Sequence, residues 1–349
     1  MRLGSLITVL CSTAFWAQTA GLSEFKSHPD DWFRADEGKR IGSNVLSWQS
    51  REGSWPKNTN TFAQPFTGDR AELHGTFDNG ATTDELRFLA RAYNVTRDDR
   101  CKNACERGVA HILGAQYLNG GWPQYSPPPK TSYHRHITFN DNSMVRLMEF
   151  VREVGREKQW SFLAATQRIA ATAGFERGVD CILKCQIKVN GKLTAWCAQH
   201  DEIDLRPRPA RKFELASISG SESVGVARLL MSIDRPSPEV VRAVDAAMVW
   251  FESAKIPGIK IVQQPAPGTP RGTDKVVVKN ASAKPMWARF YEIDTNKPIF
   301  SGRDGVKKFS LAEIEYERRN GYSWLGYWPE TLLEKEYLAW RRVTKESGK

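Results

Sequence analysis

The feature that most constrains the fold of this chain is an internal repeat, in which one helical segment recurs 70 residues further on. The first copy reads Glu106-Arg107-Gly108-Val109, then Ile112, Leu113, Gln116 and Asn119-Gly120, and the second reads Glu176-Arg177-Gly178-Val179, then Ile182, Leu183, Gln186 and Asn190-Gly191. Each copy ends in an Asn-Gly turn, and a tryptophan follows, Trp122 or Trp196. Because a repeat of this size cannot bury its apolar face alone, its copies must stack. We therefore predict a mainly α fold, an α/α toroid, in which helical hairpins form an incomplete barrel.

Apolar residues at three- and four-residue spacing predict the other helices. They are expected at residues 39–50, from 83 onward, and at 100–117, 143–156, 162–186, 224–233, 238–254, 310–319 and 331–341. A third, degenerate copy of the repeat runs from Val244 to Gly258. Between about residues 255 and 305, apolar and polar residues alternate around prolines and turns, which predicts short strands beside the toroid. Residues 21–349 are thus expected to form a single domain.

Residues 1–20 have the pattern of a secretory signal peptide. Arg2 is followed by the apolar run LGSLITVLCSTAFWA, which is too short to span a bilayer, and small residues follow as far as Ala20. We place cleavage after Ala20, although Gln18 is not the small residue preferred at the third position before the cut. No later stretch is apolar enough to cross a membrane. The sequence therefore predicts a protein exported to the periplasm or out of the cell, with no membrane partner.

The charge of the chain predicts an anionic partner. Its 50 lysines and arginines exceed its 40 acidic residues, which gives a formal net charge of +10. Such an excess suits nucleic acid, an acidic membrane surface or an acidic polysaccharide. Export argues against nucleic acid, so an acidic polysaccharide is the partner we expect.

Five cysteines would remain after cleavage: Cys101, Cys105, Cys181, Cys185 and Cys197. Two pairs stand four residues apart, so the members of each pair share a helical face. Their spacing lacks the short CxxC hairpins of structural zinc sites. We expect buried thiols or a disulfide between helices instead.

A polar, basic loop occupies most of the stretch from Trp196 to Ser223, which reads WCAQHDEIDLRPRPARKFELASISGSES. Pro207 and Pro209 exclude a regular helix, so the side chains are carried on a shaped loop. The basic ones are Arg206, Arg208, Arg211 and Lys212. Arginines usually lie on solvated surface, and the surroundings must show whether these do more.

Long motifs run through most of the chain, from about Asn79 to Trp340. They are FDNGATTDELRFLA, NGGWPQ, HITFNDNSMV, NGKLTAWCAQHD, ARKFELASISGSES, WARFYEIDTNKPIFSGRDG and ERRNGYSWLGYWP. In sequence and in order they resemble the pectate lyases of polysaccharide lyase family ten. The resemblance implies an α/α toroid that cleaves polygalacturonate by calcium-assisted β-elimination, with an arginine as the base.

The resemblance also implies roles for single residues. Arg211 matches the base, Asp78 and Asp141 match aspartates that serve calcium and catalysis, and Lys184, Arg289 and Arg303 match cations that grip uronate carboxylates. Without it, Arg289 and Arg303 would be read as surface salt-bridge residues. An arginine in water stays protonated, so only a desolvated site crowded with cations could favour its neutral form. Lys212 is the alternative base, because lysine releases its proton more easily.

The chemistry of β-elimination explains why cations and acidic residues are both needed. Removing the C5 proton of a uronate builds charge next to a carboxylate, and neutralising that carboxylate stabilises the enolate-like transition state. Asp78 in FDNG and Asp141 in FNDNS offer hard oxygen ligands that suit Ca²⁺. Either could instead cap the helix that follows it. Asn79 is a further ligand candidate, but it and Asn140 also suit turns.

Other interpretations stay open at this stage. Three histidines could hold a metal with a hydrolytic water: His134, His136 and His200. Three carboxylates could supply the acid and base of a glycoside hydrolase: Asp201, Glu202 and Asp204. A chain of the same fold could also bind an acidic polysaccharide without turnover. Our expectation is an exported, monomeric, calcium-dependent pectate lyase acting on polygalacturonate, with His200 and Asp201 in the substrate cleft.

Overall fold

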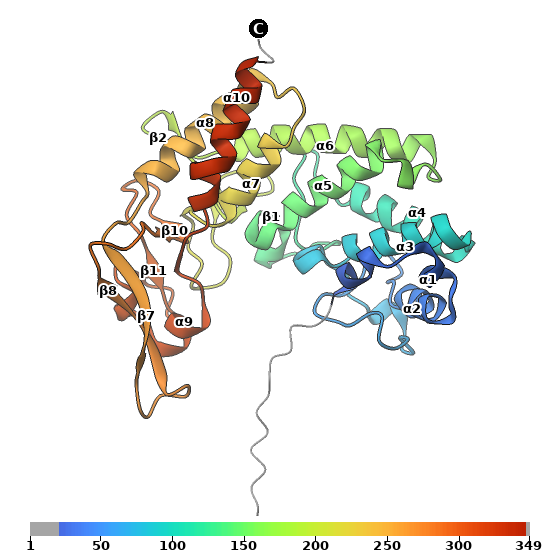
Figure 1. Cartoon of the computed structure of the whole chain (residues 1–349), viewed down its shortest axis with the longest axis horizontal. Coiled ribbons are helices and arrows are strands. Elements are labelled where there is room, and N and C mark those ends of the chain that lie inside the picture. Colours follow the sequence, from blue (N-terminus) through green and yellow to red (C-terminus); the bar gives the residue numbers. More distant parts are fainter. Residues whose placement is uncertain (1–20, 347–349) are drawn as a thin grey trace, which may run out of the picture.

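The computed structural model describes residues 21–346, so the predicted signal peptide lies outside the described part of the chain. The fold is mainly helical with short strands (Figure 1). Its α-helices are α1 (Asp30–Arg34), α2 (Asp36–Ser47), α3 (Thr83–Thr96), α4 (Asp99–Gly114), α5 (Ser143–Arg156), α6 (Ala165–Cys185), α7 (Glu222–Met231), α8 (Pro238–Ser253), α9 (Tyr316–Gly321) and α10 (Tyr337–Glu346). None of the helices within these residues is both long and apolar enough to span a membrane.

Short helical turns and strands fill the connections. The turns are η1 (Leu22–Ser27), η2 (Arg70–Glu72), η3 (Asp78–Gly80), η4 (Tyr133–Arg135), η5 (Asn140–Asn142), η6 (Lys158–Trp160), η7 (Leu311–Glu313) and η8 (Leu332–Glu336). The antiparallel strand pairs are β2 (Lys188–Val189) with β3 (Lys192–Leu193), β6 (Ile218–Ser219) with β10 (Phe290–Tyr291), β7 (Ile259–Pro265) with β8 (Thr273–Lys279), β9 (Trp287–Ala288) with β13 (Leu325–Gly326), and β11 (Phe300–Ser301) with β12 (Lys307–Lys308). A three-stranded sheet joins β1 (Ile137–Thr138), β4 (Gln199–His200) and β5 (Pro207–Arg208).

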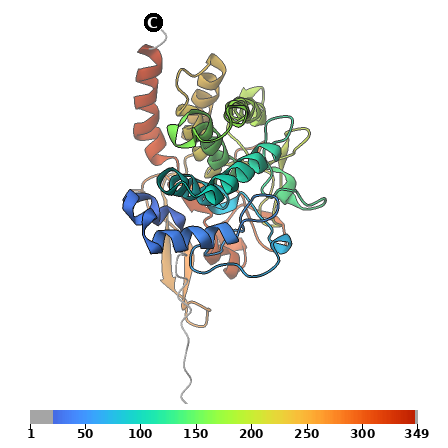
Figure 2. The same ribbon diagram turned by 90° about the vertical axis from the view of Figure 1, so that its right-hand side faces the viewer.

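The long helices form two layers. Helices α2, α4, α6 and α8 are successive neighbours in the first layer, and α3, α5 and α7 are successive neighbours in the second. We call a first-layer helix, the loop after it and the second-layer helix that follows a unit. The first unit and α8 lie at opposite ends of the row in Figure 1, and Figure 2 shows the blue, teal and green units rising in order. In the last unit, η8 packs on α8 and leads into α10.

A buried tryptophan ties each loop to the first-layer helix before it. Trp55, Trp122, Trp196 and Trp287 are each at most 2% exposed. Their indole N–H groups donate to helix carbonyls at 2.8–2.9 Å, those of Val45, Ile112, Ile182 and Phe251. Within residues 21–346 the repeat therefore has four copies, whereas the sequence revealed two and a degenerate third. The intervals differ too much for a simple offset to find them, from 10 residues in the first unit to 36 in the last.

A glutamine joins each unit to the next. Gln116 Nε2 donates to Gly120 O in its own loop at 2.9 Å and to Gly174 O in α6 at 2.8 Å. Gln49 bonds Gly53 and Ala104 in the same way, and Gln186 bonds Thr194 and Ala243. Gln49 and Gln186 are buried and Gln116 is partly buried, and each amide fastens a loop to the following first-layer helix, which explains why glutamine recurs in the repeat.

The repeated glycines allow the two layers to approach each other. A Cβ on Gly108 would lie 2.4 Å from Leu86 of α3, and one on Gly178 would lie 2.0 Å from the sulfur of Met148 in α5. A side chain at either position would have to displace Leu86 or Met148, both of which are fully buried. The recurrence of glycine at the same place in α4 and α6 is thus a packing requirement.

Some expectations from the sequence need correction. The helix expected at 310–319 is broken into η7 and α9, because the backbone is extended at Ile314, which is buried, and at Glu315. The segment before residue 36 contains η1 and α1, which were not expected. All five cysteines in the described residues are buried free thiols, and no disulfide joins them.

Candidate active site

Two turns of the same shape lie side by side at one end of the second layer. Phe77 and Phe139 are buried, and each is followed by a short helical turn, η3 or η5, that leads into α3 or α5. The residue two positions after each phenylalanine, Asn79 or Asp141, has a φ near +50° (53° and 49°). Turns η3 and η5 contact each other. Equivalent loops of two successive units therefore present equivalent side chains to one place.

The side chains that these turns bring together leave buried oxygens unpaired. Asp78 Oδ1 and Asn140 Oδ1, at equivalent positions, are buried and lack a hydrogen-bond partner. Asp141 Oδ2 accepts a hydrogen bond from Asn140 Nδ2 at 2.7 Å. Orphaned buried oxygens cost free energy unless a donor or a cation satisfies them. Together with the carboxylate of Asp141 they form a set of hard oxygen donors, and this set fits a cation such as Ca²⁺.

Asn79, the third expected ligand, is placed differently. Its residue is exposed, and its Nδ2 donates to Asn58 Oδ1 at 3.3 Å in a neighbouring loop. Asn140 instead supplies a buried amide oxygen from η5, the turn that contacts the one carrying Asp78. The signal that could have found Asn140 is the alignment of FDNG with FNDN, in which it stands opposite Asp78.

Arg289 reaches the same place from the last unit. It is 9% exposed, and its Nη2 lies 3.3 Å from Asp141 Oδ1 and is also bonded to Glu222 at the start of α7. Its guanidinium lies 4.8 Å from the ring centre of Tyr322. Burial lowers the pKa of Arg289, but the negative charges of Glu222 and Asp141 raise it again and leave the pKa raised. Arg289 therefore brings a fixed positive charge to the expected metal ligands.

Arg211 is held by a carboxylate and two rings. Its Nε and Nη2 donate to the two oxygens of Glu214 at 2.8 and 2.5 Å, and the hydroxyl of Tyr322 donates to Glu214 at 2.7 Å. Its guanidinium lies 4.8 Å from the ring of Phe213 and 5.7 Å from that of Tyr322. The bond to Glu214 raises the pKa of Arg211, so the side chain is held protonated. Tyr322 thus links Arg211 to Arg289.

Arg303 joins this cluster at its edge. Its guanidinium lies 5.5 Å from the ring of Phe213, the same ring that Arg211 covers, and pairs with Glu317 at 3.2 Å. Its side chain is 62% exposed, so it is accessible from solvent. Three of the expected basic residues therefore lie on two linked aromatic rings.

Several residues of the site were missed by sequence reasoning. Lys57 Nζ lies 2.6 Å from Asp78 Oδ2, and the charge of Lys57 also acts on His134 and Tyr133. Glu222 and Tyr322 were not singled out either. Lys57 lies outside the long motifs, whereas Glu222 and Tyr322 lie within ARKFELASISGSES and ERRNGYSWLGYWP. The contacts that bring Glu222 to Arg289 and Tyr322 to Glu214 are visible only in the fold.

His200 and Asp201 are buried beside this site and are engaged by other groups, and the ring centre of His200 lies 5.5 Å from that of Phe139. His200 is fully buried; its Nε2 accepts from the backbone N–H of Cys197 and its Nδ1 contacts Leu205 O. Burial lowers its pKa to about 4, so it stays neutral. Asp201 accepts from two backbone N–H groups and from Arg208. Both side chains shape the basic loop and leave no free group for a substrate.

The contacts in the same region do not favour a three-histidine metal site or a glycoside hydrolase centre. Glu202 is paired with Arg135 at 2.5 Å and His136 at 2.8 Å. The group of potential metal ligands found in the described residues is His136, Asp201 and Glu202, which includes only one of the three histidines. Its atoms already have protein partners. Lys184 lies at the exposed end of α6, in a hollow that contains no other expected site residue.

Comparison with known proteins decides the family. The family model described as pectic acid lyase matches residues 49–333. The chain belongs to the pectic acid lyase family. It is therefore a pectate lyase.

Solved structures agree with this assignment. A Family 10 polysaccharide lyase from Cellvibrio cellulosa is 33% identical with a TM-score of 0.75, over 89% of this chain and 97% of that one. An aspartate-to-alanine mutant of a Family 10 polysaccharide lyase from Cellvibrio cellulosa, in complex with trigalacturonic acid, is 32% identical with a TM-score of 0.75, over 92% and 99%. No curated protein matches.

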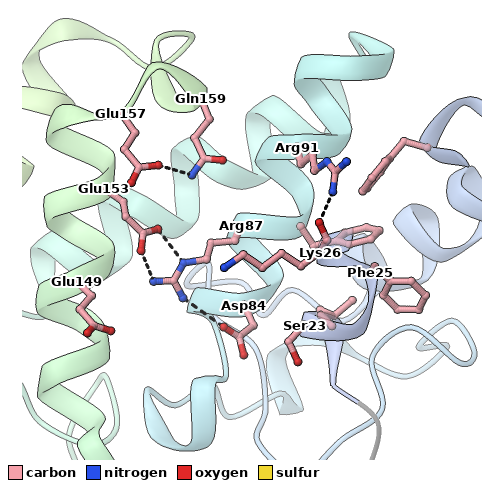
Figure 3. Close-up of a pocket in the computed structure, with 13 residues that line it drawn as sticks. Ser23, Phe25, Lys26, Asp84, Arg87, Arg91, Glu149, Glu153, Glu157 and Gln159 are labelled. Atoms are coloured by element: carbon pink, nitrogen blue, oxygen red, sulfur yellow. Dashed lines mark hydrogen bonds and ion pairs between the residues drawn. The ribbon is translucent and has the colours of Figure 1, made fainter. Parts of the chain in front are cut away.

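A hollow of about 590 Å³ in this pectate lyase lies elsewhere, between η1, α3 and α5 (Figure 3). Arg87 bridges Glu153 and Asp84 across it. Its lining includes four acidic residues, Asp84, Glu149, Glu153 and Glu157, and three basic ones, Lys26, Arg87 and Arg91. The lining therefore has a net negative charge, and it suits an anionic polymer less well than the arginine cluster does.

Proposed function

We propose that this pectate lyase is exported and depends on calcium, and that it cleaves polygalacturonate by β-elimination with Arg211 as the base. Two contacting turns carry the proposal: η3 and η5 hold the unpaired buried oxygens Asp78 Oδ1 and Asn140 Oδ1. Arg289 bonds Asp141 of η5 and shares the Tyr322 ring with Arg211. Hard anionic ligands and fixed cations are the two requirements of uronate β-elimination.

Asp78, Asn140 and Asp141 would hold the calcium ion. When bound, the ion would neutralise a uronate carboxylate and so favour loss of the C5 proton. The two unpaired oxygens support this assignment, because each lacks a partner that a cation would supply. Asn79 stays a candidate only for an outer contact, since it is exposed and bonded to Asn58.

Arg289 and Arg303 would bind uronate carboxylates. Arg289 is fixed by Glu222 and Tyr322, so it would place a carboxylate beside the metal ligands with little loss of side-chain freedom. Arg303 is exposed and would contact the polymer further along. One solved relative is in complex with trigalacturonic acid, and this supports an anionic polysaccharide as the substrate here. Lys184 would then contact only a distant part of a long polymer.

Arg211 would remove the C5 proton. Two rings and Glu214 hold its guanidinium in one orientation, which is what a positioned base needs. The Glu214 carboxylate opposes loss of a proton from Arg211, so forming neutral Arg211 weakens the bond between them. The neighbouring positive charges of Arg289, Lys57 and calcium would favour the neutral form. We therefore propose an enzyme whose rate rises with pH.

The proposed enzyme is one domain, residues 21–349, with the helical units arranged as an incomplete α/α toroid. The two layers of successive helices support this arrangement. Export rests on the apolar segment at residues 1–20, and we propose that the protein acts as a monomer in the periplasm or outside the cell.

One assay tests the proposal. Purified protein mixed with polygalacturonate and calcium should produce an unsaturated product that absorbs ultraviolet light, and EGTA should abolish the signal without unfolding the protein. Asp141→Ala should raise the calcium concentration needed. Reducing ends without absorbance would indicate a hydrolase, and full activity in chelator would exclude the calcium role.

A further inference from the structure

Lys57 occupies a position that neither the sequence motifs nor the expected chemistry assigned. It follows Trp55 in the loop of the first unit, and its Nζ lies 2.6 Å from Asp78 Oδ2. The side chain of Asp78 is only 6% exposed and that of Lys57 is 28% exposed. The other oxygen of the same carboxylate, Oδ1, is the buried atom without a partner. The carboxylate of Asp78 is therefore half satisfied, by a lysine on one side and by nothing on the other.

The physical consequence follows from charge. A buried carboxylate needs a counter-charge, and in the metal-free protein the lysine supplies it. A divalent cation at Oδ1 would share one carboxylate with the ammonium group, and two positive charges so close in a partly buried site repel each other strongly. Lys57 and a metal ion would therefore compete for the carboxylate of Asp78.

Two further observations show that the lysine is suited to this place. Burial lowers the pKa of Lys57, but the hydrogen bond and charge of Asp78 outweigh it, so the pKa is raised and the ammonium stays charged. Its Nζ also lies 5.6 Å from the ring centre of Tyr125. An aromatic face attracts a cation, so the ammonium keeps a favourable neighbour if it is pushed away from Asp78.

We propose that Lys57 is a built-in counter-ion that holds Asp78 when calcium is absent and opposes calcium binding, and thereby sets the calcium concentration at which the site fills. This inference rests on the proposed calcium role of Asp78. It assigns to Lys57 a function in regulating the metal rather than in gripping the substrate.

The test measures calcium binding without substrate. Thermal unfolding midpoints are recorded in calcium–EGTA buffers, with titration calorimetry using calcium alone. Lys57→Met should unfold at a lower temperature than wild type in EGTA, since Asp78 loses its counter-charge. It should then be stabilised by calcium at a concentration at least about tenfold lower than wild type requires. Lys57→Arg, which keeps the charge, should titrate nearly like wild type.

Two controls make the result specific. Lys130→Met removes an exposed lysine from the corresponding loop of the next unit, and its calcium titration should match that of wild type. In an Asp78→Asn background, Lys57→Met should change calcium binding little, because the shared carboxylate is gone. If Lys57→Met is unfolded in EGTA, refolding on addition of calcium is the expected result.

Several outcomes would overturn the inference. An unchanged calcium titration in Lys57→Met, with a raised KM for polygalacturonate, would make Lys57 a substrate contact. An equal loss of stability with and without calcium would make it a structural ion pair, and failure to fold at any calcium concentration would do the same. If wild type makes unsaturated product but shows no calcium response at all, this inference fails; if it makes no unsaturated product, the proposed function fails.

Discussion

At the scale of single residues, Glu214 governs the protonation of Arg211. Its two oxygens accept from Nε and Nη2 along one edge of the guanidinium, and it also accepts from Tyr322, so three groups are locked in one arrangement. A bond to a carboxylate stabilises the protonated arginine, which raises its pKa. The same bond that orients the proposed base therefore opposes its reaction.

Glu214→Gln should shift the pH profile. Removing the anion lowers the pKa of Arg211, so at any given pH more of the neutral form is present, and the rising limb of the rate should move to lower pH even if the maximal rate falls. Initial rates of unsaturated product formation, measured from neutral to alkaline pH, check this. A rising limb at the same pH in both proteins would contradict Arg211 as the titrating group.

Arg211 itself gives the sharpest substitution. Arg211→Ala should reduce kcat by about 10²- to 10⁴-fold while binding of trigalacturonate survives, because a base acts on the barrier. Arg211→Lys should restore little, since lysine keeps the charge but loses the fork that Glu214 holds. Lys212→Ala is the matched control, because Lys212 is an exposed neighbour. Near-normal turnover in Arg211→Ala with an inactive Lys212→Ala would move the base to lysine.

The residues that sequence could predict are those within distinctive motifs. Asp78, Asp141, Arg211 and Arg289 stand in such motifs, and the structure places them in one region. The role of Lys57 could not be predicted, because it depends on a contact with Asp78, which lies 21 residues further along the chain. The cleft role expected for His200 and Asp201 stays a prediction, and in the structure both side chains bond backbone groups inside the loop.

At the scale of elements, buried polar side chains decide how helices begin and how units join. Glu85 caps α3: it accepts from the backbone N–H of Thr82 and from the hydroxyl of Thr61, and it is 6% exposed. Gln116 serves the junction between α4 and α6. Sequence periodicity predicted these helices well, because apolar stripes depend on local spacing. It could not predict the junctions, because a glutamine looks the same whether it faces solvent or a carbonyl.

Glu85 predicts a pH dependence of stability. Burial raises its pKa to about 7, from a usual value of 4.5. Between these two values the folded protein holds a proton that the unfolded chain releases, so stability falls as pH rises through this window, by up to about 3 kcal/mol. Glu85→Gln should remove this loss, so its urea midpoint relative to wild type should rise from pH 5 to 7 and then level off. The exposed Glu313→Gln should show no such trend.

Gln116→Leu tests the junctions between units. The change leaves the carbonyls of Gly120 and Gly174 without their amide donor, which should cost about 2–4 kcal/mol. The melting temperature should fall accordingly, whereas Gln263→Leu on the exposed β7–β8 hairpin should be nearly neutral. An equal effect of the two changes would show that the Gln116 amide adds nothing to the junction.

At the scale of the whole molecule, charge favours an anionic polymer. The net charge of +10 reflects 50 basic against 40 acidic residues. De-esterified polygalacturonate should be a better substrate than highly methylated pectin, because an ester offers Arg289 and Arg303 nothing to pair with. Added salt should raise KM on the polymer by screening exposed contacts. Equal rates on both polymers would count against the carboxylate-binding role.

The repeat predicted the helical architecture of the molecule but not its number of units. Offsets of 70 residues were visible only where loop lengths agreed. The last unit is interrupted by the β7–β8 hairpin, which separates Phe251 from its tryptophan. A repeat is found in a sequence when its copies are equally spaced. The fold requires only that each tryptophan bonds the first-layer helix before it, whatever the length of the loop between them.

The four tryptophan loops have a consequence for how this protein becomes active. Each unit delivers one part of the site after its tryptophan: Asp78, then Asn140, then Glu222, then Arg289. Partial assembly of such a row can be stable, since each unit contacts mainly its neighbours. No partial assembly, however, can hold all four groups. During refolding, helical circular dichroism should therefore return before turnover does, and a chain ending after α7 would be a folded protein without an active site.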